Sequence, residues 1–170
     1  EGYTGNNTNT FILIQNPGDS VAQICVSYML QGGGVKLKKI EVNPKSRYTI
    51  AAQDPDQVGV GYAFSTKLAS SQEIIVERAM YWPNGDGTQG GHATTGVTSP
   101  ATEWYLAEGY TGQNFQTFIL IQNPNNEAAE IEVTYMPDEG ENIVKNLTVA
   151  GNSRYTIVAH DPNPEGPGIG

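Results

Sequence analysis

The sequence contains little cysteine, little basic charge and no long hydrophobic run. Among its 170 residues the single cysteine, Cys25, excludes an internal disulfide and any metal site built from several cysteines. No apolar stretch approaches the roughly 18 residues that a membrane-spanning helix needs, so we expect no membrane insertion. Lys and Arg number 9 against 18 Asp and Glu. Because nucleic-acid binding depends on cations that neutralise phosphates, we expect no nucleic-acid partner.

The remaining composition is that of a folded, turn-rich chain. Hydrophobic residues make up 38% of the sequence and can build a core, while 20 Gly and 10 Pro supply turns. The β-branched and aromatic residues come in short bursts, which favours strands over helices.

An internal repeat dominates the sequence. EGYTGNNTNTFILIQNP, starting at Glu1, returns as EGYTGQNFQTFILIQNP at Glu108. SRYTI at Ser46 returns at Ser153, with the same offset in residue number. The two copies align without a gap and agree at roughly half their positions, as expected of repeated structural units. The second copy ends at the counterpart of Ala63, before the last two strands expected of a unit.

The strand pattern is clearest in the segment from Val21 to Met29. Ala22, Ile24, Val26 and Tyr28 alternate with polar residues, which predicts a strand with one buried face. Further strands are expected at residues 10–15, 35–42, 47–52, 62–69 and 73–82, at their counterparts in the second copy, and at 104–107 as an opening strand. About seven short strands at this spacing predict an all-β, immunoglobulin-like antiparallel β-sandwich, repeated in tandem.

The domain boundaries follow from the repeat. We expect a first sandwich at residues 1–82 without its opening strand and a second at residues 104–170 without its last two strands. Residues 83–103, rich in Gly, Thr and Pro, show no strand periodicity and are expected to form a linker or a contact between repeats.

Candidate catalytic groups are few. A hydrolase needs a nucleophile with a positioned base, and the histidines, His92 and His160, lie in no recognisable signature. His160 replaces Gln53 of the first copy, so the repeated fold does not require it. We therefore expect no enzymatic activity and no catalytic residues.

Oxygen-rich turns are the weak candidates for a metal site. Asp54, Asp56, Asn84 and Asp86 could contribute oxygens to calcium, although their spacing matches no defined calcium loop. The same residue types are common in ordinary turns, and we expect no obligatory cofactor.

Aromatic residues are the candidates for contacts. Large rings contribute most in a core or an interface, so we expect both tryptophans in the core or between repeats. The candidate inter-repeat contacts are Trp82, His92, Trp104, Tyr105, Leu106 and Tyr110. Exposed rings could instead stack on surface glycans.

The strings FILIQNP, AQICVSYM, SRYTI, IIVERAMYW and WYLAEG together resemble a tandem β-sandwich repeat of large secreted or cell-surface bacterial proteins. The resemblance implies an extracellular location and no catalytic residues. We expect a stalk, a spacer or a filament-building unit that contacts neighbouring repeats or copies of itself by strand pairing. The alternative is a carbohydrate-binding or adhesion module, with or without calcium.

Overall fold

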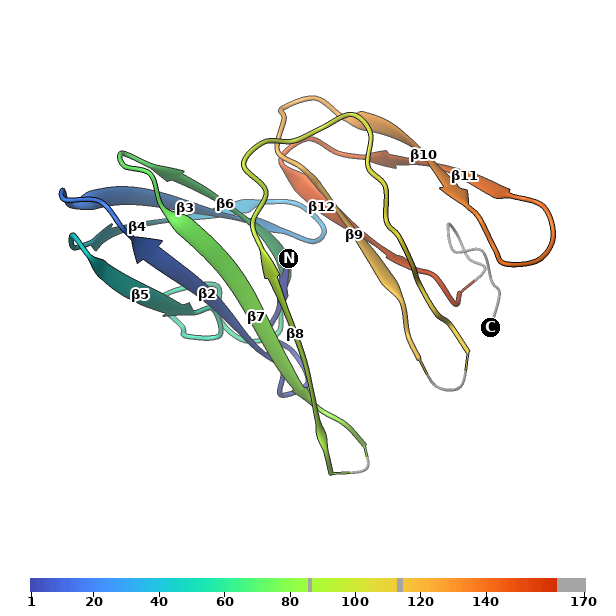
Figure 1. The fold of residues 1–170 in the computed structure, drawn as a ribbon, viewed down its shortest axis with the longest axis horizontal. Helices are drawn as coiled ribbons and strands as arrows, with labels where there is room; N and C mark the ends of the chain where they lie inside the picture. Colours follow the sequence, from blue (N-terminus) through green and yellow to red (C-terminus); the bar gives the residue numbers. More distant parts are fainter. Residues whose placement is uncertain (86, 113–114, 162–170) are drawn as a thin grey trace. The chain divides into compact units, whose positions relative to one another are not determined.

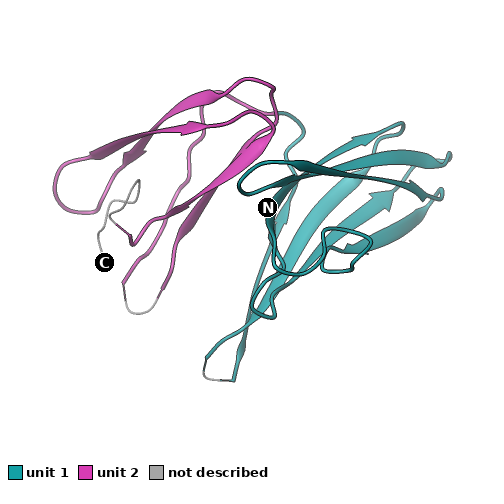
Figure 2. Cartoon of the chain, turned by 180° about the vertical axis from the view of Figure 1, so that it is seen from behind, with its two compact units in different colours: residues 1–99 teal, residues 100–170 magenta. Residues whose placement is uncertain are grey.

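The computed structural model describes residues 1–85, 87–112 and 115–161, and its regular elements are all β-strands (Figure 1). In this described part, no helix is long and apolar enough to cross a membrane. The chain divides into two compact units, Glu1–Ser99 and Pro100–Gly170 (Figure 2).

Unit 1 is an antiparallel β-sandwich, as the sequence predicts. One four-stranded sheet has the order β1-β6-β3-β4 and the other the order β5-β2-β7-β8. The strands are β1 (Gly2–Tyr3), β2 (Asn9–Asn16), β3 (Ala22–Leu30), β4 (Val35–Val42), β5 (Ser46–Ala51), β6 (Ala63–Ser70), β7 (Ile75–Pro83) and β8 (Gln89–Thr95). The finer, immunoglobulin-like strand arrangement stays a prediction.

The buried residues alternate with more exposed ones along the strands and mark the face that forms the core. The predicted inner face of β3 is confirmed, because Ala22, Ile24, Val26 and Tyr28 are all buried. Ile12 and Ile14 of β2 are buried against them in one hydrophobic cluster. Cys25 is half-buried on the opposite face of β3.

Tyr28 carries a polar atom into this core. Its side chain is 0% exposed, and its hydroxyl donates a hydrogen bond of 2.9 Å to Gln57 Oε1. Its ring meets Phe64 edge to face, with centroids 5.6 Å apart. Burial, and to a lesser degree the charge of Asp56, raises the pKa of Tyr28 well above its ordinary value.

Two buried asparagines fix the ends of equivalent strands. Asn16 Nδ2 donates to the carbonyl oxygens of Ser20 (2.8 Å) and Val42 (2.9 Å), and Asn16 Oδ1 accepts the Gly18 N–H. Asn123, its counterpart in the second copy, repeats this network with Glu127 and Val149. The repeated Asn-Pro is therefore more than a turn signal, because its side chain joins the two sheets of its unit.

Unit 2 repeats the register of unit 1 strand for strand. It contains β9 (Phe118–Asn123), β10 (Ala129–Tyr135), β11 (Ile143–Val149) and β12 (Ser153–Val158), paired as β10-β11 and β12-β9. Phe118 lies opposite Val158 as Phe11 lies opposite Ala51, and the internal repeat aligns these two pairs with each other. Leu147, Val149 and Ile157 form the buried cluster of this unit. The described residues of unit 2 thus hold counterparts of β2 to β5.

Two sequence-based expectations about strands are wrong. Residues 83–103 were expected to contain no strand, yet β8 lies within them and pairs with β7 along its whole length. Its residues lack alternation because it is an edge strand, and β7 supplies the hydrogen bonds. Conversely, residues 104–107 were expected to form a strand and do not. No described strand pairs with them.

Candidate assembly surface

The free edge of β6 is the first part of the surface. β3 pairs with β6 along Phe64–Ser70, whereas on the opposite side β1 reaches only Ala63 and Phe64. Residues 65–70 therefore have no strand neighbour on that side within the described chain. Unpaired strand edges are sites at which another chain can add a strand.

The residues of β1 are held closely against β6 and β2. A Cβ on Gly2 would lie 2.2 Å from Phe64 Cζ, so only glycine allows this approach. The Tyr3 N–H donates to Thr10 Oγ1 (3.0 Å), and the Thr10 hydroxyl donates to the Tyr3 carbonyl (2.7 Å). We call this pair of bonds the Tyr–Thr clamp. These two bonds engage the backbone groups of Tyr3 that point away from β6.

The same clamp holds the equivalent residues of unit 2. The Tyr110 N–H donates to Thr117 Oγ1 (3.0 Å), and the Thr117 hydroxyl donates to the Tyr110 carbonyl (2.6 Å). Gly112 lies beside the Tyr110 hydroxyl as Gly5 lies beside that of Tyr3. Tyr110 is therefore held from one side as Tyr3 is, and no described strand of unit 2 pairs with its other side.

Three large side chains precede this clamp. Trp104, Tyr105 and Leu106, which we call the WYL segment, are 56%, 79% and 65% exposed. Trp104 is thus outside the core of unit 2, contrary to one expectation from the sequence. Its Nε1 donates to the Ala101 carbonyl (3.0 Å), and the Tyr105 hydroxyl donates to Glu103 Oε1 (2.7 Å).

The hydrogen-bond partners of Trp104 and Tyr105 lie close to them in the sequence. The hydrogen bond to Glu103 raises the pKa of Tyr105, since it stabilises the neutral phenol. Consecutive exposed apolar side chains of this size mark interaction surfaces. The segment is the strongest candidate for a contact in the described part of unit 2.

The two other contact candidates lie in unit 1 on paired strands. Arg78 Nη1 donates to both Nδ1 and the carbonyl oxygen of His92, each at 2.9 Å. Burial lowers the pKa of Arg78, and the charge of Glu1 opposes this shift. Trp82 lies over Gly90, whose added Cβ would be 2.4 Å from the indole nitrogen. His92 is thus bonded to the Arg78 guanidinium through both its ring and its carbonyl oxygen.

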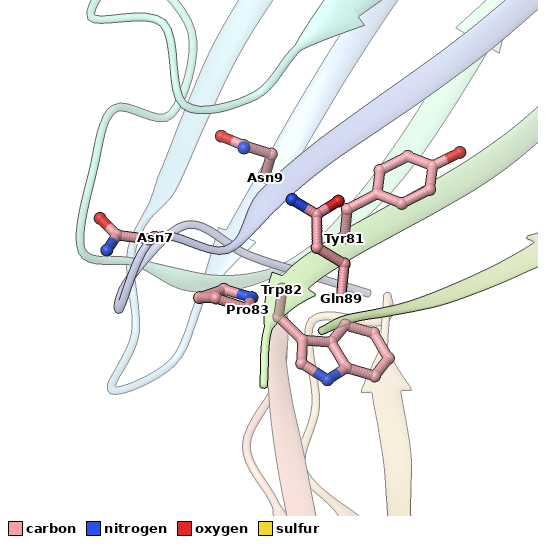
Figure 3. Close-up of a pocket in the computed structure, with 6 residues that line it drawn as sticks. All are labelled: Asn7, Asn9, Tyr81, Trp82, Pro83 and Gln89. Carbon is pink, nitrogen blue, oxygen red and sulfur yellow. The ribbon is translucent and has the colours of Figure 1, made fainter. Parts of the chain in front are cut away.

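A shallow hollow of about 210 Å³ adjoins Trp82 (Figure 3). Tyr81 and Trp82 point to opposite sides of β7, as neighbours in a strand do, and the Gln89 side chain lies beside Tyr81. The lining residues are Asn7, Asn9, Tyr81, Trp82, Pro83 and Gln89. Rings beside amides are suited to a sugar, which is the feature that favours the glycan alternative.

The calcium candidates do not converge in the described structure. In the turn that holds Asp54 and Asp56, the Gln57 N–H donates to the Asp54 carbonyl oxygen (2.9 Å), and Gln57 Nε2 donates to Asp56 Oδ2 (3.2 Å). Asn84 donates to Thr88 Oγ1 (2.8 Å) in a separate turn, and Asp86 lies outside the described residues. Among the residues described, no three His, Cys, Asp or Glu side chains are grouped to hold a metal ion.

The sequence named the aromatic contact candidates but not Thr117, which holds one of them, Tyr110, in place. No sequence motif marks Thr10 and Thr117, although both copies place a threonine at the same spacing after a tyrosine. Their identity across the two copies was the available signal.

Comparison with known proteins shows the fold alone. No protein-family model matches the chain, and no curated protein matches it. Among solved structures, the crystal structure of Thermotoga maritima 1070 is similar, with a TM-score of 0.50 and 16% identity. The likeness covers 56% of this chain and 86% of that one. At such identity a shared fold carries no function with it.

Proposed function

We propose that this chain is a non-enzymatic structural repeat of an extracellular bacterial surface protein, acting as a stalk or spacer or as the building unit of a filament. The observation that carries the proposal is the repetition of strand register: β9 to β12 pair as β2 to β5 do, at the positions that the internal repeat aligns. Units that repeat in this way extend a chain by stacking or by linking.

The surface supports strand pairing as the means of assembly. Within the described chain, residues 65–70 of β6 have no strand neighbour on one side, and the exposed WYL segment precedes the clamp of unit 2. Strand addition satisfies backbone groups at such an edge and derives affinity from main-chain hydrogen bonds.

Electron microscopy together with the mass of the species in solution tests this function. Filaments with a regular axial spacing would support the filament form. A monodisperse monomer would refute the filament and leave the stalk or spacer. Specific binding of a glycan would count against both the filament and the stalk or spacer.

The second candidate is a carbohydrate-binding or adhesion module centred on the hollow beside Trp82. A glycan array separates the candidates, with Trp82→Ala compared with Trp104→Ala. Binding that is lost only in Trp82→Ala would favour the glycan site, because Trp104 does not line the hollow.

A further inference from the structure

We propose that the outward face of strands β5, β2 and β7 in unit 1 packs against the same face of a second copy, with Arg47 of each copy beside Glu77 of the other. This inference rests on the proposed structural function and deepens it, because it names a lateral contact between chains. The residues that carry it lie on three neighbouring strands of one sheet.

The pairing register defines this outward face. Ile12 and Ile14 of β2 are buried in the core, so the residues that alternate with them point outward. Residues directly opposite each other on neighbouring antiparallel strands share a face. We call the resulting outward set the β2 face: Phe11, Leu13 and Gln15 of β2, Arg47 and Thr49 of β5, and Ile75 and Glu77 of β7.

The β2 face is the outward surface that the two copies of the repeat share. On the other sheet, every outward residue between Gln23 and Ser27 and between Leu37 and Glu41 differs in the second copy. An outward position is free to change unless its side chain makes a contact, so identity there indicates a binding surface. The β2-face residues of β2 and β5 are all identical in the second copy, where they are Phe118, Leu120, Gln122, Arg154 and Thr156.

The β2 face combines an apolar centre with one charge on each side. Ile75 is 50% exposed, and Leu13 is half-buried between the neighbouring strands. Arg47 on β5 and Glu77 on β7 are both exposed and lie on either side of β2. A hollow of about 420 Å³ is lined by these two charged residues and by Leu13 and Ile75. An apolar surface with charges at its margin is suited to contact with another protein surface.

The arginine is held in the same way in both copies. Arg47 Nη1 donates to Thr49 Oγ1 (3.2 Å), and Arg154 Nη2 donates to Thr156 Oγ1. A guanidinium carries five N–H donors, and this bond uses one of them. The threonine therefore orients the arginine along the outward side of its strand, where a carboxylate can bind it.

A second copy is the occupant because the β2 face is complementary to itself. A two-fold axis parallel to β2 lays β2 of each copy over β2 of the other, and β5 of each over β7 of the other. Arg47 then lies beside Glu77 of the second copy, and the same pair forms again on the other side of the axis. An axis across the strands would instead lay β5 over β5 and bring like charges together, which opposes association.

The dimensions of packed sheets allow this pair. Facing sheets lie about 10 Å apart, with their strands within about 30° of each other. Gln15 lies opposite both Arg47 and Ile75, so Glu77 is displaced from the level of Arg47 by two residues along the strands. The Cα atoms of Arg47 and of Glu77 in the second copy would be roughly 12 Å apart, a distance that the two extended side chains span.

Charge reversal tests the contact. Sedimentation of the chain over a range of concentrations measures the dimer dissociation constant. Arg47→Glu and Glu77→Arg each create two pairs of like charges in the two-fold contact, and we expect each to raise this constant by about tenfold or more. The double variant restores opposite charges at both pairs. We expect its constant to return to within about threefold of the wild-type value.

The matched controls lie on the outward face of the other sheet. Lys39→Glu and Glu41→Arg make the same changes in net charge at exposed positions of β4. We expect neither to change the dissociation constant, because neither residue belongs to the β2 face. The unfolding midpoint of each variant, measured in parallel, verifies that the fold is intact.

Carbodiimide coupling gives a second measurement, because it joins a lysine amine to a carboxylate. We would mix ¹⁵N-labelled and unlabelled chains that carry Arg47→Lys and identify the coupled peptides by mass spectrometry. We expect an amide between positions 47 and 77 of chains with different labels. Such a product reports both the residues in contact and their origin in two copies.

Several results would overturn the proposal: a wild type that sediments as a monomer at every concentration, single reversals without effect, a double variant no better than the single ones, controls that weaken association equally, or a 47–77 amide found only within one chain. Filaments or stalks seen by electron microscopy beside any of these results would leave the proposed function standing. Specific glycan binding by a chain that passes the charge tests would refute the proposed function and keep the contact.

Discussion

Replacing Asn16 with alanine tests how strongly one buried side chain fixes the sandwich of unit 1. Asn16 is 0% exposed and makes three hydrogen bonds, to the Ser20 carbonyl, the Val42 carbonyl and the Gly18 N–H. Alanine removes all three and offers no replacement, while the backbone partners stay where the strands hold them.

The magnitude follows from these partners. The bond to Val42 is buried, so its loss leaves a carbonyl without a partner away from water, at a cost of about 1–3 kcal/mol. The other two bonds are only partly buried and contribute about 0.5–1.5 kcal/mol each. Since water can reach those two partners in the variant, we expect a total loss of about 2–4 kcal/mol in the free energy of unfolding. This is a large part of the roughly 5–15 kcal/mol that is typical of a domain.

The assay is urea unfolding followed by Trp82 fluorescence. A Trp104→Phe background makes Trp82 the single tryptophan, so the signal reports unit 1. Asn9→Ala is the control, because Asn9 is on the same strand but exposed, and its loss should change stability by less than about 0.5 kcal/mol. Asn123→Ala, read through Trp104 in a Trp82→Phe background, should destabilise unit 2 by a similar amount.

The result that would refute the reasoning is an Asn16→Ala variant no less stable than Asn9→Ala. Asn16→Asp sharpens the test, since aspartate keeps the shape and an acceptor for Gly18 but loses both N–H donors. At neutral pH it should be at least as destabilising as alanine. A wild-type stability for this variant would mean that the two donated bonds contribute nothing.

Two further predictions concern Tyr28 and Gly90. Because the pKa of Tyr28 is raised in the folded state above its ordinary value of about 10, its contribution is complete below about pH 10 and is lost as the pH rises further, by up to about 1.4 kcal/mol per pH unit. Urea unfolding at about pH 9 and pH 11 should show this slope and Tyr28→Phe should remove it; an equal slope in both proteins would exclude Tyr28 as its source. Gly90→Ala should displace the Trp82 indole, shift its emission and cost about 1–3 kcal/mol, whereas Gly85→Ala, with no atom within 4 Å of the added Cβ, should do neither. An unshifted Trp82 emission spectrum in Gly90→Ala would contradict the close approach.

The alternation of apolar residues was sufficient to predict the fold class and the buried faces. Every second residue of β3 faced inward as the spacing required, because a two-residue period leaves only one face for the core: Ala22, Ile24, Val26 and Tyr28. The asparagine networks were not predictable in the same way. Asn16 looks like a turn residue in sequence, and its bond to Val42 joins positions 26 residues apart that only the folded sheets bring together.

The clearest failure of the sequence analysis concerns residues 104–107. Gly2 and Tyr3 form a strand, and the same clamp holds Tyr3 and Tyr110, yet residues 104–107 form none. What differs is the partner, since β6 lies beside β1 and no such strand lies beside the second segment in the described chain. A strand requires hydrogen bonds from a neighbour, and no pattern within so short a segment encodes whether the neighbour is present. The WYL segment has the side chains of a strand but no neighbouring strand in the described chain. A strand edge like that of β6 would supply the backbone hydrogen bonds that it needs to form one.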